Sequence, residues 1–487
     1  MSDIIRNLDP KPVWKNFADL NAVPRPSKKE ERVIKFMKDF GERLGLETLE
    51  DEVGNVIIRK PASKGMEDRK MVVMQSHLDM VHQKNNDTDF NFETQGIEMY
   101  VDGDWVRAKG TTLGADNGLG IATIMAILES ETIAHPPIEA LFTIDEETGM
   151  TGAQGLKPGV LQGEILLNLD TEEDDEIGVG CAGGVDVTAT RTYSEEQTPE
   201  HMSGFKITVK GLQGGHSGMD IIKGLGNANK FMNRLLFDAY ENVGLRIHSI
   251  NGGSLRNAIP RESVAEVAVE NIHKDAFEHE LNVLATTIKT EYKTLEPELE
   301  VVIEAIETPE TIMDLGVQEG FLRSIYTAHN GVYRMSPDIE NLVETSNNIA
   351  RITLGNGEVE VLCLTRSSVE SSKTDLANAL RASFELSGFV VEFSGEYPGW
   401  QPNMDSDILK VLDKTYKSLN NGEQAHIAAC HAGLECGILG QHYPEMEMIS
   451  FGPTIRGAHS PDERASFSST KKYWELVLQV LKEIPVK

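Results

Sequence analysis

The stretch that decides the fold reads MVVMQSHLD over residues 71–79, an apolar run of strand length that ends in a histidine and an aspartate. Two further apolar runs of this length follow at residues 138–144 and 165–169, and a helical pattern covers residues 117–130. Strands that are apolar on both faces and separated by helices predict an α/β fold with a mainly parallel sheet. Such sheets carry their chemistry at the carboxyl ends of the strands.

The pattern changes after about residue 200. A helical stretch at residues 227–240 is followed by alternating strand patterns at 262–270, 298–306 and 359–365, which is typical of an α+β module. From residue 396 the α/β style returns to the end of the chain. We therefore expect one α/β domain made of residues 1–203 and 396–487, with an α+β domain of residues 204–395 inserted into it. A chain of 487 residues is long enough for two or three domains.

Near the N-terminus, Ser27-Lys28-Lys29-Glu30 matches a capping box, in which a serine hydroxyl caps the first turn of a helix. Apolar residues then recur at helical spacing up to Gly45, which predicts a helix that ends there. We interpret this helix as scaffold.

The charge of the chain excludes several classes of partner. It has 46 Lys and Arg against 77 Asp and Glu, a formal net charge of −31. This charge repels phosphate backbones and anionic membranes, so we expect small-molecule partners and neither nucleic acid nor membrane. The first twenty residues lack an apolar secretion signal, and no apolar run reaches about 18 residues, so we expect a cytoplasmic protein. The four cysteines have no C-x-x-C spacing and are expected to be reduced thiols.

Acidic and histidine side chains gather at the ends of the predicted strands. They are His77 and Asp79 after the first strand, Asp116 before the helix, Glu146 and Glu147 after the second strand, and Asp170 after the third. Because the carboxyl ends of parallel strands meet at one edge of a sheet, we expect these side chains to converge. Imidazole and carboxylate groups without a thiolate are a ligand set for Zn²⁺, Mn²⁺ or Co²⁺.

Five motifs in order along the chain carry a resemblance to a known family. They read QSHLD at residues 75–79, LGADNG at 113–118, DEETG at 145–149, NLD at 168–170 and AHSPDE at 458–463. This set resembles the successive motifs of the M20 family of dinuclear metallopeptidases, and within it the subgroup of aminoacyl-histidine (Xaa-His) dipeptidases. The similarity runs from Pro24 to the C-terminal helix. It implies a metallopeptidase catalytic domain with an inserted α+β lid domain.

The resemblance also implies a metal centre of two divalent ions, most simply Zn²⁺, with Mn²⁺ or Co²⁺ as alternatives. The implied ligands are His77 and Asp170 for one ion, Glu147 and His459 for the other, and Asp116 as the bridge between them. Asp79 would orient His77, and the peptide bond after Asp116 would be cis. A water between two such ions has a lowered pKa, so a carboxylate can take its proton at neutral pH. Glu146 is the implied general base and later proton donor.

Two groups outside these motifs are candidates for substrate contacts. In the inserted domain, His216 resembles the lid histidine that stabilises the oxyanion, and Asn257 and Arg366 resemble residues that hold the C-terminal end of a substrate. An arginine fork suits a carboxylate, although a surface ion pair explains Arg366 equally well. Further along, CHAGLECG at residues 430–437 matches the dipeptidase subgroup, and its Glu435 is the candidate partner of the free amino group of the substrate.

The function that follows is hydrolysis of Xaa-His and related dipeptides such as β-alanyl-histidine. The alternative is another amidohydrolase of the same family, an aminoacylase, a deacylase or a small-peptide exopeptidase, because the metal ligands do not select the substrate. A dinucleotide site is excluded: the G-x-G-x-x-G match at residues 178–183 is followed by a strand pattern instead of a helix. Smaller members of the family dimerise through the lid, so a homodimer stays open.

Overall fold

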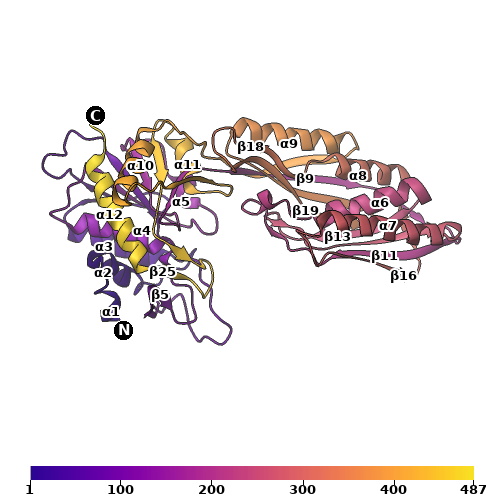
Figure 1. The fold of residues 1–487 in the computed structure, drawn as a ribbon, viewed down its shortest axis with the longest axis horizontal. Coiled ribbons are helices and arrows are strands. Elements are labelled where there is room, and N and C mark those ends of the chain that lie inside the picture. Colours follow the sequence, from indigo (N-terminus) through magenta and orange to yellow (C-terminus); the bar gives the residue numbers. More distant parts are fainter. Residues whose placement is uncertain (1) are drawn as a thin grey trace. The chain divides into compact units, whose positions relative to one another are not determined.

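The computed structural model describes the backbone from residue 2 and the side chains from residue 4, in both cases to residue 487. These residues form two compact units (Figure 1). Unit 1 contains the residues up to Gly180 together with Trp400–Ala429 and Leu434–Lys487, and unit 2 contains Cys181–Gly399 and Cys430–Gly433. The domain limits predicted from the sequence, after residues 203 and 395, stay a prediction.

Unit 1 is built on an eight-stranded sheet in the order β1-β2-β6-β3-β7-β23-β8-β22. Its strands are β1 (Glu47–Glu50), β2 (Val56–Lys60), β3 (Val72–His77), β6 (Ile138–Thr143), β7 (Ile165–Asn168), β8 (Glu176–Cys181), β22 (His426–Cys430) and β23 (Glu447–Ser450). The central strands β6, β3, β7 and β23 are parallel. Every residue of β3, β6 and β7 is buried, in keeping with the mainly apolar composition of these strands. The predicted α/β fold with a mainly parallel sheet is confirmed.

Helices pack on this sheet and a small second sheet completes the unit. The helices are α1 (Ser2–Ile5), α2 (Lys11–Leu20), α3 (Glu31–Arg43), α4 (Ala115–Glu129), α5 (Thr151–Gly155), α10 (Asp407–Leu419), α11 (Glu435–His442) and α12 (Phe467–Glu483). The second sheet has the order β24-β25-β5-β4, from β4 (Met99–Asp102), β5 (Trp105–Ala108), β24 (Ile455–Arg456) and β25 (Arg464–Ser466). Helix α4 packs on β3 and is covered in turn by α2, so it is buried almost along its whole length.

The first predicted helix forms, but its capping box does not. Helix α3 ends at Arg43, and Gly45 follows with a positive φ of 68°, as expected for a helix stop. No side chain caps its first turn. The hydroxyl of Ser27 instead donates to Oδ2 of Asp79 at 2.8 Å. The segment before α3 therefore contacts Asp79 at the edge of the sheet and does not cap the helix.

Unit 2 is built on a nine-stranded sheet with the path β16-β11-β15-β13-β19-β20-β9-β21, to which β18 adds by pairing with β19. The strands of this sheet are β9 (Gly183–Thr192), β11 (Met202–Lys210), β13 (Arg246–Gly253), β15 (Ser263–Glu270), β16 (Glu300–Ile306), β18 (Gly331–Met335), β19 (Val343–Gly355), β20 (Glu358–Ser367) and β21 (Val390–Tyr397). Two short pairs lie beside it, β10 (Glu195–Gln197) with β17 (Thr311–Met313) and β12 (Gly215–His216) with β14 (Ala258–Ile259).

Four helices cover the sheet of unit 2, and their order shows two similar halves. They are α6 (Ala228–Val243), α7 (Lys274–Tyr292), α8 (Leu315–Thr327) and α9 (Glu370–Glu385), and neighbours touch in the order α7-α6-α8-α9. The chain order β11-α6-β13-β15-α7-β16 forms one β-α-β-β-α-β half. Strand β9, then α8-β19-β20-α9-β21, forms the other with the corresponding strand order, and β13 pairs with β19 where the halves meet. The first half is thus inserted after the first strand of the second.

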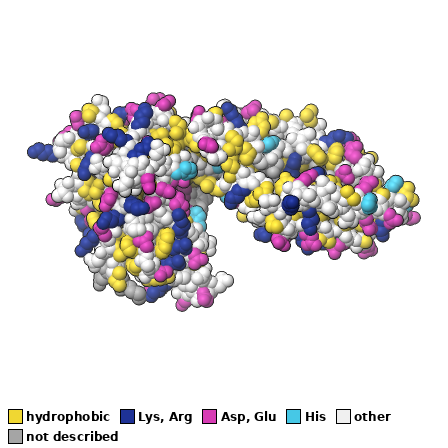
Figure 2. Space-filling model, in the orientation of Figure 1, with side chains coloured by type: hydrophobic (Ala, Val, Ile, Leu, Met, Phe, Trp, Pro, Cys, Tyr) yellow, Lys and Arg dark blue, Asp and Glu magenta, His cyan; other side chains and the backbone are white. Residues whose placement is uncertain are grey.

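The surface agrees with the charge of the sequence. In the view of Figure 2, acidic side chains are spread over the visible surface of both units with Lys and Arg between them. Among residues 2–487, no helix combines the length and the apolar character that spanning a bilayer requires.

Candidate metal centre

The parallel strands of unit 1 bring the predicted side chains to one edge of the sheet. His77 is the last residue of β3 and Asp79 follows two residues later, while Glu146 and Glu147 come shortly after β6. Asp170 lies two residues beyond the end of β7. Because β6, β3 and β7 are adjacent and parallel, their carboxyl ends meet.

Two more segments complete the cluster. Asp116 lies at the start of α4 with non-helical backbone angles, and the Asp116–Asn117 peptide bond is cis, as the resemblance implies. Asn117 donates from Nδ2 to the backbone oxygen of Leu169 at 2.7 Å and to the carboxylate of Asp170. His459 lies between β24 and β25 with a positive φ of 63°. Residues that are far apart in the sequence therefore lie within a few ångströms of one another.

The side chains form two sets that share Asp116. In the first set, Nε2 of His77 lies 3.1 Å from Oδ1 of Asp116 and 3.5 Å from Oδ1 of Asp170. In the second set, Nε2 of His459 lies 3.2 Å from Oδ2 of Asp116 and 3.0 Å from Oε2 of Glu147. Each set offers three ligand atoms within 4.8 Å of one another. The two oxygens of one carboxylate thus face two separate groups of donors.

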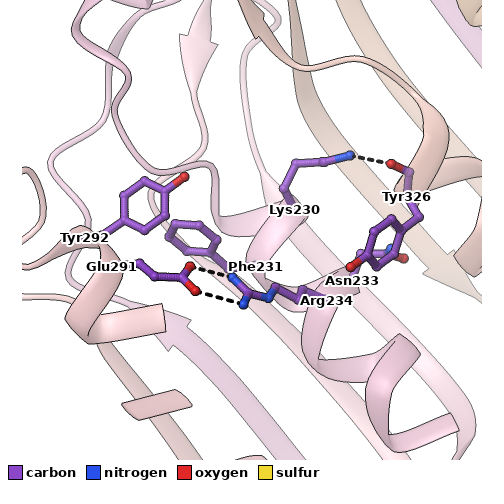
Figure 3. A pocket seen from close by; sticks show the side chains of 7 residues that line it. All are labelled: Lys230, Phe231, Asn233, Arg234, Glu291, Tyr292 and Tyr326. Carbon is purple, nitrogen blue, oxygen red and sulfur yellow. Dashed lines mark hydrogen bonds and ion pairs between the residues drawn. The ribbon is translucent and has the colours of Figure 1, made fainter. Parts of the chain in front are cut away.

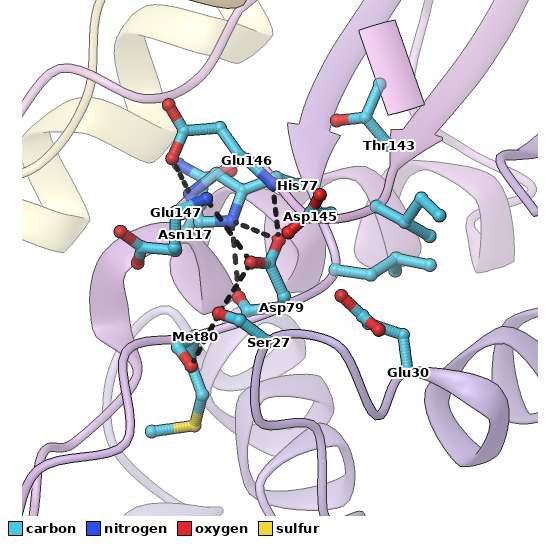
Figure 4. Close-up of polar contacts among 12 residues, drawn as sticks. Ser27, Glu30, His77, Asp79, Met80, Asn117, Thr143, Asp145, Glu146 and Glu147 are labelled. Carbon is cyan, nitrogen blue, oxygen red and sulfur yellow. Dashed lines mark hydrogen bonds and ion pairs between the residues drawn. The ribbon is translucent and has the colours of Figure 1, made fainter. Parts of the chain in front are cut away.

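Asp79 holds His77, a member of the first set, in place (Figure 4). Its carboxylate lies 3.4 Å from Nδ1 of His77, on the side of the ring away from Asp116. Oδ1 accepts a hydrogen bond from the backbone nitrogen of Glu146 at 3.0 Å, and Oδ2 accepts from Ser27. Asp79 is completely buried. One carboxylate therefore fixes both the histidine ring and the turn that carries Glu146.

Glu463 holds the loop that leads into Asp116. Its two carboxylate oxygens accept hydrogen bonds from four consecutive backbone nitrogens, those of Leu113, Gly114, Ala115 and Asp116, at 2.7 to 3.3 Å. Burial raises the pKa of Glu463 to about 7, although these donors favour its charged form. Glu463 belongs to the motif at residues 458–463, but the motif alone does not indicate this role. The sequence feature that points to Glu463 is its place four residues after His459.

The histidines of the cluster bind protons strongly in the absence of a cation. Burial by itself lowers the pKa of His77, but the carboxylates of Asp170, Asp116 and Asp79 raise it well above its ordinary value. Hydrogen bonds to Asp116 and Glu147 raise the pKa of His459 to about 11. Such shifts are the mark of a strongly negative pocket that favours any positive charge.

The pKa values of two carboxylates of the cluster are shifted in opposite directions. Burial opposes ionisation of Asp116, yet its hydrogen bonds with His459 and His77 hold its pKa below the ordinary value. Burial raises the pKa of Glu146 well above the ordinary value, and the charges of Asp170 and Glu435 raise it further against the effect of His77. Oε2 of Glu146 lies 4.0 Å from Nε2 of His77. Of the two, Asp116 is the group held charged and Glu146 the group that accepts a proton most readily.

Glu435 lies beneath the cluster at the end of a chain of polar side chains. Its Oε2 accepts hydrogen bonds from Nε2 of Gln75 at 2.6 Å and from the hydroxyl of Thr143 at 2.7 Å. Gln75 in turn accepts from Nδ2 of Asn168, whose Oδ1 accepts from the hydroxyl of Ser450. Oε1 of Glu435 has no hydrogen-bond partner among the described residues, and burial raises the pKa of this carboxyl to about 8. The donors of the chain all point toward Glu435.

The other predicted residues lie in unit 2. His216 is on β12, which pairs with β14, and its Nδ1 accepts hydrogen bonds from the backbone nitrogens of Gly218 and Met219 at 3.2 and 3.1 Å. The proton of the neutral ring is therefore on Nε2. Asn257 is exposed, and its backbone oxygen accepts from the nitrogen of Ser217, so it adjoins His216.

Arg366 is a buried cation near these residues. It lies on β20, is 4% exposed, and donates from Nη1 to the hydroxyl of Tyr397 at 2.7 Å. Burial lowers the pKa of His216, and the charge of Arg366 lowers it further. Because its side chain is buried, Arg366 does not form the surface ion pair that the sequence left open, and its contact with a substrate stays a prediction.

Unit 2 also contains a separate cavity of about 190 Å³ (Figure 3). Its charged side chains are occupied with one another or with backbone: Arg234 pairs with both carboxylate oxygens of Glu291 at 2.6 and 3.0 Å, and Lys230 donates to the carbonyl oxygens of Ile325 and Tyr326. The acceptors of these contacts lie in the last turns of helices α7 and α8. The cavity therefore presents no unpaired charge, in contrast to the cluster of unit 1.

Comparison with known proteins agrees with the geometry. The model of the family described as Peptidase family M20/M25/M40 matches residues 73–483. The chain belongs to this peptidase family. The cytosol non-specific dipeptidase of Escherichia coli (strain K12) is 43% identical to this member over 483 residues, which is 99% of each chain.

Solved structures give the same result for the fold. The crystal structure of an aminoacylhistidine dipeptidase from Vibrio alginolyticus matches this M20/M25/M40 peptidase with a TM-score of 0.95 and 43% identity, over 100% of both chains. An aminopeptidase from Bacillus cereus matches with a TM-score of 0.58 and 16% identity over 98% of this chain and 99% of that one, which shows a shared fold. The recognised family and fold are therefore confirmed.

Proposed function

We propose that this peptidase is a metal-dependent dipeptidase that hydrolyses Xaa-His and related dipeptides, β-alanyl-histidine among them. The observation that carries the proposal is the pair of ligand sets that share Asp116, with Glu146 beside them. The two relatives that match over the whole chain bear the names of dipeptidases, which supports this choice of substrate.

The donor set fits two divalent cations. His77 and Asp170 would hold one, Glu147 and His459 the other, and Asp116 would bridge them. Two imidazoles with carboxylates and no thiolate suit Zn²⁺ best, and also Mn²⁺ or Co²⁺. When bound, two such ions supply Lewis acidity, which lowers the pKa of a water and polarises a carbonyl oxygen.

Glu146 is the proposed acid and base. Its raised pKa makes it ready to take a proton from the attacking water and to deliver that proton to the leaving nitrogen. Its backbone nitrogen is fixed by Asp79, so the side chain leaves from a rigid turn. Asp79 acts through this turn and through His77.

His216 is the proposed donor to the oxyanion. Its pKa is lowered, so the ring is neutral at pH 7, and its Nδ1 is occupied by two backbone donors. The remaining Nε2–H can donate one hydrogen bond to an oxygen that gains negative charge. Asn257 and Arg366 are proposed to hold the carboxylate of the dipeptide, because an amide and a buried guanidinium both donate hydrogen bonds to that group.

Glu435 is the proposed partner of the free amino group. A buried carboxylate with one oxygen lacking a partner is satisfied by an ammonium ion. Its charge acts on Glu146, so it lies near the reacting groups. This assignment favours dipeptides over N-acylated substrates and so favours a dipeptidase over a deacylase.

Release of free histidine from β-Ala-His and Ala-His tests the proposal. The metal-stripped protein is assayed with and without Zn²⁺ or Mn²⁺, with N-acetyl-Ala-His as the blocked control. Metal-dependent release from the free-amine dipeptides alone is the expected result. Cleavage of the blocked substrate alone would make the protein a deacylase.

Two further expectations belong to this proposal. We place the protein in the cytoplasm, in keeping with the name of the Escherichia coli relative. A homodimer is proposed as its assembly, and size-exclusion chromatography with light scattering measures it directly.

A further inference from the structure

Arg25 is a buried guanidinium that joins two of the loops around the candidate metal centre. It is 1% exposed. Nη1 donates to the backbone oxygens of Leu78 at 3.2 Å and Asp79 at 3.0 Å, and Nη2 donates to the backbone oxygen of Gly114. The first two oxygens directly follow His77, and the third is two residues before Asp116. One side chain therefore bridges the backbone of two of the three segments that form the first ligand set, those of His77 and Asp116.

Two glycines leave room for this guanidinium. A Cβ atom at Gly114 would lie 2.6 Å from Nη2 of Arg25, and one at Gly118 would lie 2.7 Å from the same atom. Real Cβ atoms essentially never make contacts this short. The loop before α4 and its first turn are thus shaped around the arginine, which makes it part of the architecture at Asp116.

Arg25 also places a fixed positive charge among carboxylates. Burial lowers its pKa to about 10, and the charges of Glu463, Asp79, Asp116 and Glu147 oppose that effect. The group is therefore charged at neutral pH. The described hydrogen bonds of Arg25 go to three backbone oxygens and to Oδ1 of Asn21 at 3.3 Å, and none goes to a carboxylate. Its charge therefore acts on the carboxylates through space.

We propose that Arg25 is a positioning residue of the dinuclear centre, which sets the separation between the loop of His77 and the loop of Asp116. The proposal rests on the metal-dependent function proposed above and adds a residue that touches neither a candidate ligand side chain nor the substrate. A guanidinium is required because only a planar fork reaches three carbonyl oxygens of two loops at once.

The test compares Arg25→Met and Arg25→Lys with Arg59→Met and Arg59→Lys. Arg59 is a matched control, since it lies on β2 of the same sheet and donates to Glu139, Glu47 and the backbone oxygen of Val160, away from the ligand loops. Each protein is loaded with Co²⁺, and the visible absorption spectrum and the Co²⁺ affinity by calorimetry are measured, followed by kcat and KM.

For Arg25→Met we expect Co²⁺ affinity to fall about 10- to 100-fold, the usual cost of losing a group that orients metal ligands. The spectrum should shift and kcat should fall more than KM changes. Arg25→Lys keeps the charge and loses the fork, so it should show the same spectral shift with a smaller loss of affinity. Both Arg59 variants should match the wild-type spectrum and affinity.

An unchanged spectrum and an unchanged Co²⁺ affinity in Arg25→Lys would overturn the proposal. This test does not depend on Arg25→Met, so it holds even when that variant does not fold. A drop in melting temperature without any change in Co²⁺ binding would make Arg25 an ordinary core residue and would likewise overturn it. The binding measurements need no substrate. If the wild-type protein binds Co²⁺ but cleaves no dipeptide, the proposed function fails while the inference on Arg25 is still decided.

Discussion

The histidines of the two units experience opposite electrostatic environments. In unit 1, carboxylates raise the pKa of His77 well above its ordinary value and that of His459 to about 11. In unit 2, burial lowers the pKa of His431 to about 3 and also lowers that of His216, and the charge of Arg366 acts in the same direction on both. Histidine is therefore held cationic in the ligand cluster of unit 1 and neutral beside Arg366 in unit 2.

This difference teaches what each region can bind. A pocket that drives protons onto imidazoles favours any cation, and divalent metals replace those protons when they bind. A neutral histidine beside a buried arginine favours groups that carry or gain negative charge, such as a carboxylate or an oxyanion. The residue type alone gives neither answer, because the neighbours decide which charge is stable.

The largest expected effect tests whether the acidic cluster of unit 1 carries the chemistry. Glu146→Gln removes a proton acceptor and leaves all candidate ligands in place, so kcat should fall about 10²- to 10⁴-fold. Metal content, measured by atomic emission, should remain at two ions per chain. Wild-type kcat in this variant would remove Glu146 from the mechanism, and loss of metal would make it a ligand.

A smaller loss is expected in the neutral region of unit 2. His216→Ala should lower kcat about 10²-fold, the usual effect of removing one oxyanion donor. His279→Ala, which changes an exposed histidine on α7, is the matched control and should behave as wild type. Steady-state kinetics with a metal assay decides the point: if His216→Ala loses metal, the contrast between the two regions is wrong.

Arg366→Lys tests the carboxylate preference of the same region. The substitution keeps the charge and removes the fork, so KM for a dipeptide should rise about tenfold while kcat changes less. Arg351→Lys changes an exposed arginine on β19 and serves as the control. A dipeptide amide, which lacks the carboxylate, should show the same KM with wild type and Arg366→Lys; a rise in both substrates would argue against carboxylate binding.

The smallest expected effect is the number of protons that metal binding releases from the cluster of unit 1. A group with a raised pKa is protonated below that pKa, so His77 and His459 both carry a proton in the metal-free protein at pH 7. Ligation requires neutral imidazole, so loading the centre should release protons, and metal affinity should rise with pH. Calorimetry at pH 7 in buffers of different ionisation enthalpy should show a net release of protons on metal binding. No release would contradict the charged state assigned to unit 1.

The fold of unit 1 was readable from the sequence because its strands are buried on both faces. β3, β6 and β7 appear as continuous apolar runs, and the chemistry of a parallel sheet lies at the ends of such strands. Unit 2 was readable only as an α+β module. Its two interleaved halves follow from strand pairing across the chain, such as that of β13 with β19, which local patterns do not encode.

The roles of the residues that support the centre could not be predicted from the sequence, for a related reason. Ser27 matched a capping box, yet its hydroxyl donates to Asp79, which lies 52 residues further along the chain. Glu463 accepts from four backbone nitrogens about 350 residues before it. A local motif predicts local hydrogen bonds, and here the partners are brought by the fold.

By itself, the sequence indicated the buried strands β3, β6 and β7 with the helix α4 among them, the residue types at the strand ends and the membership of a metallopeptidase family. Only the tertiary structure decided which carboxylate faces two ligand sets, which histidines are charged, and which guanidinium joins the two loops. The physical reason is that apolar periodicity and strand length are local properties of the chain. Charge state and hydrogen-bond partnership depend on burial and on neighbours that are distant in sequence.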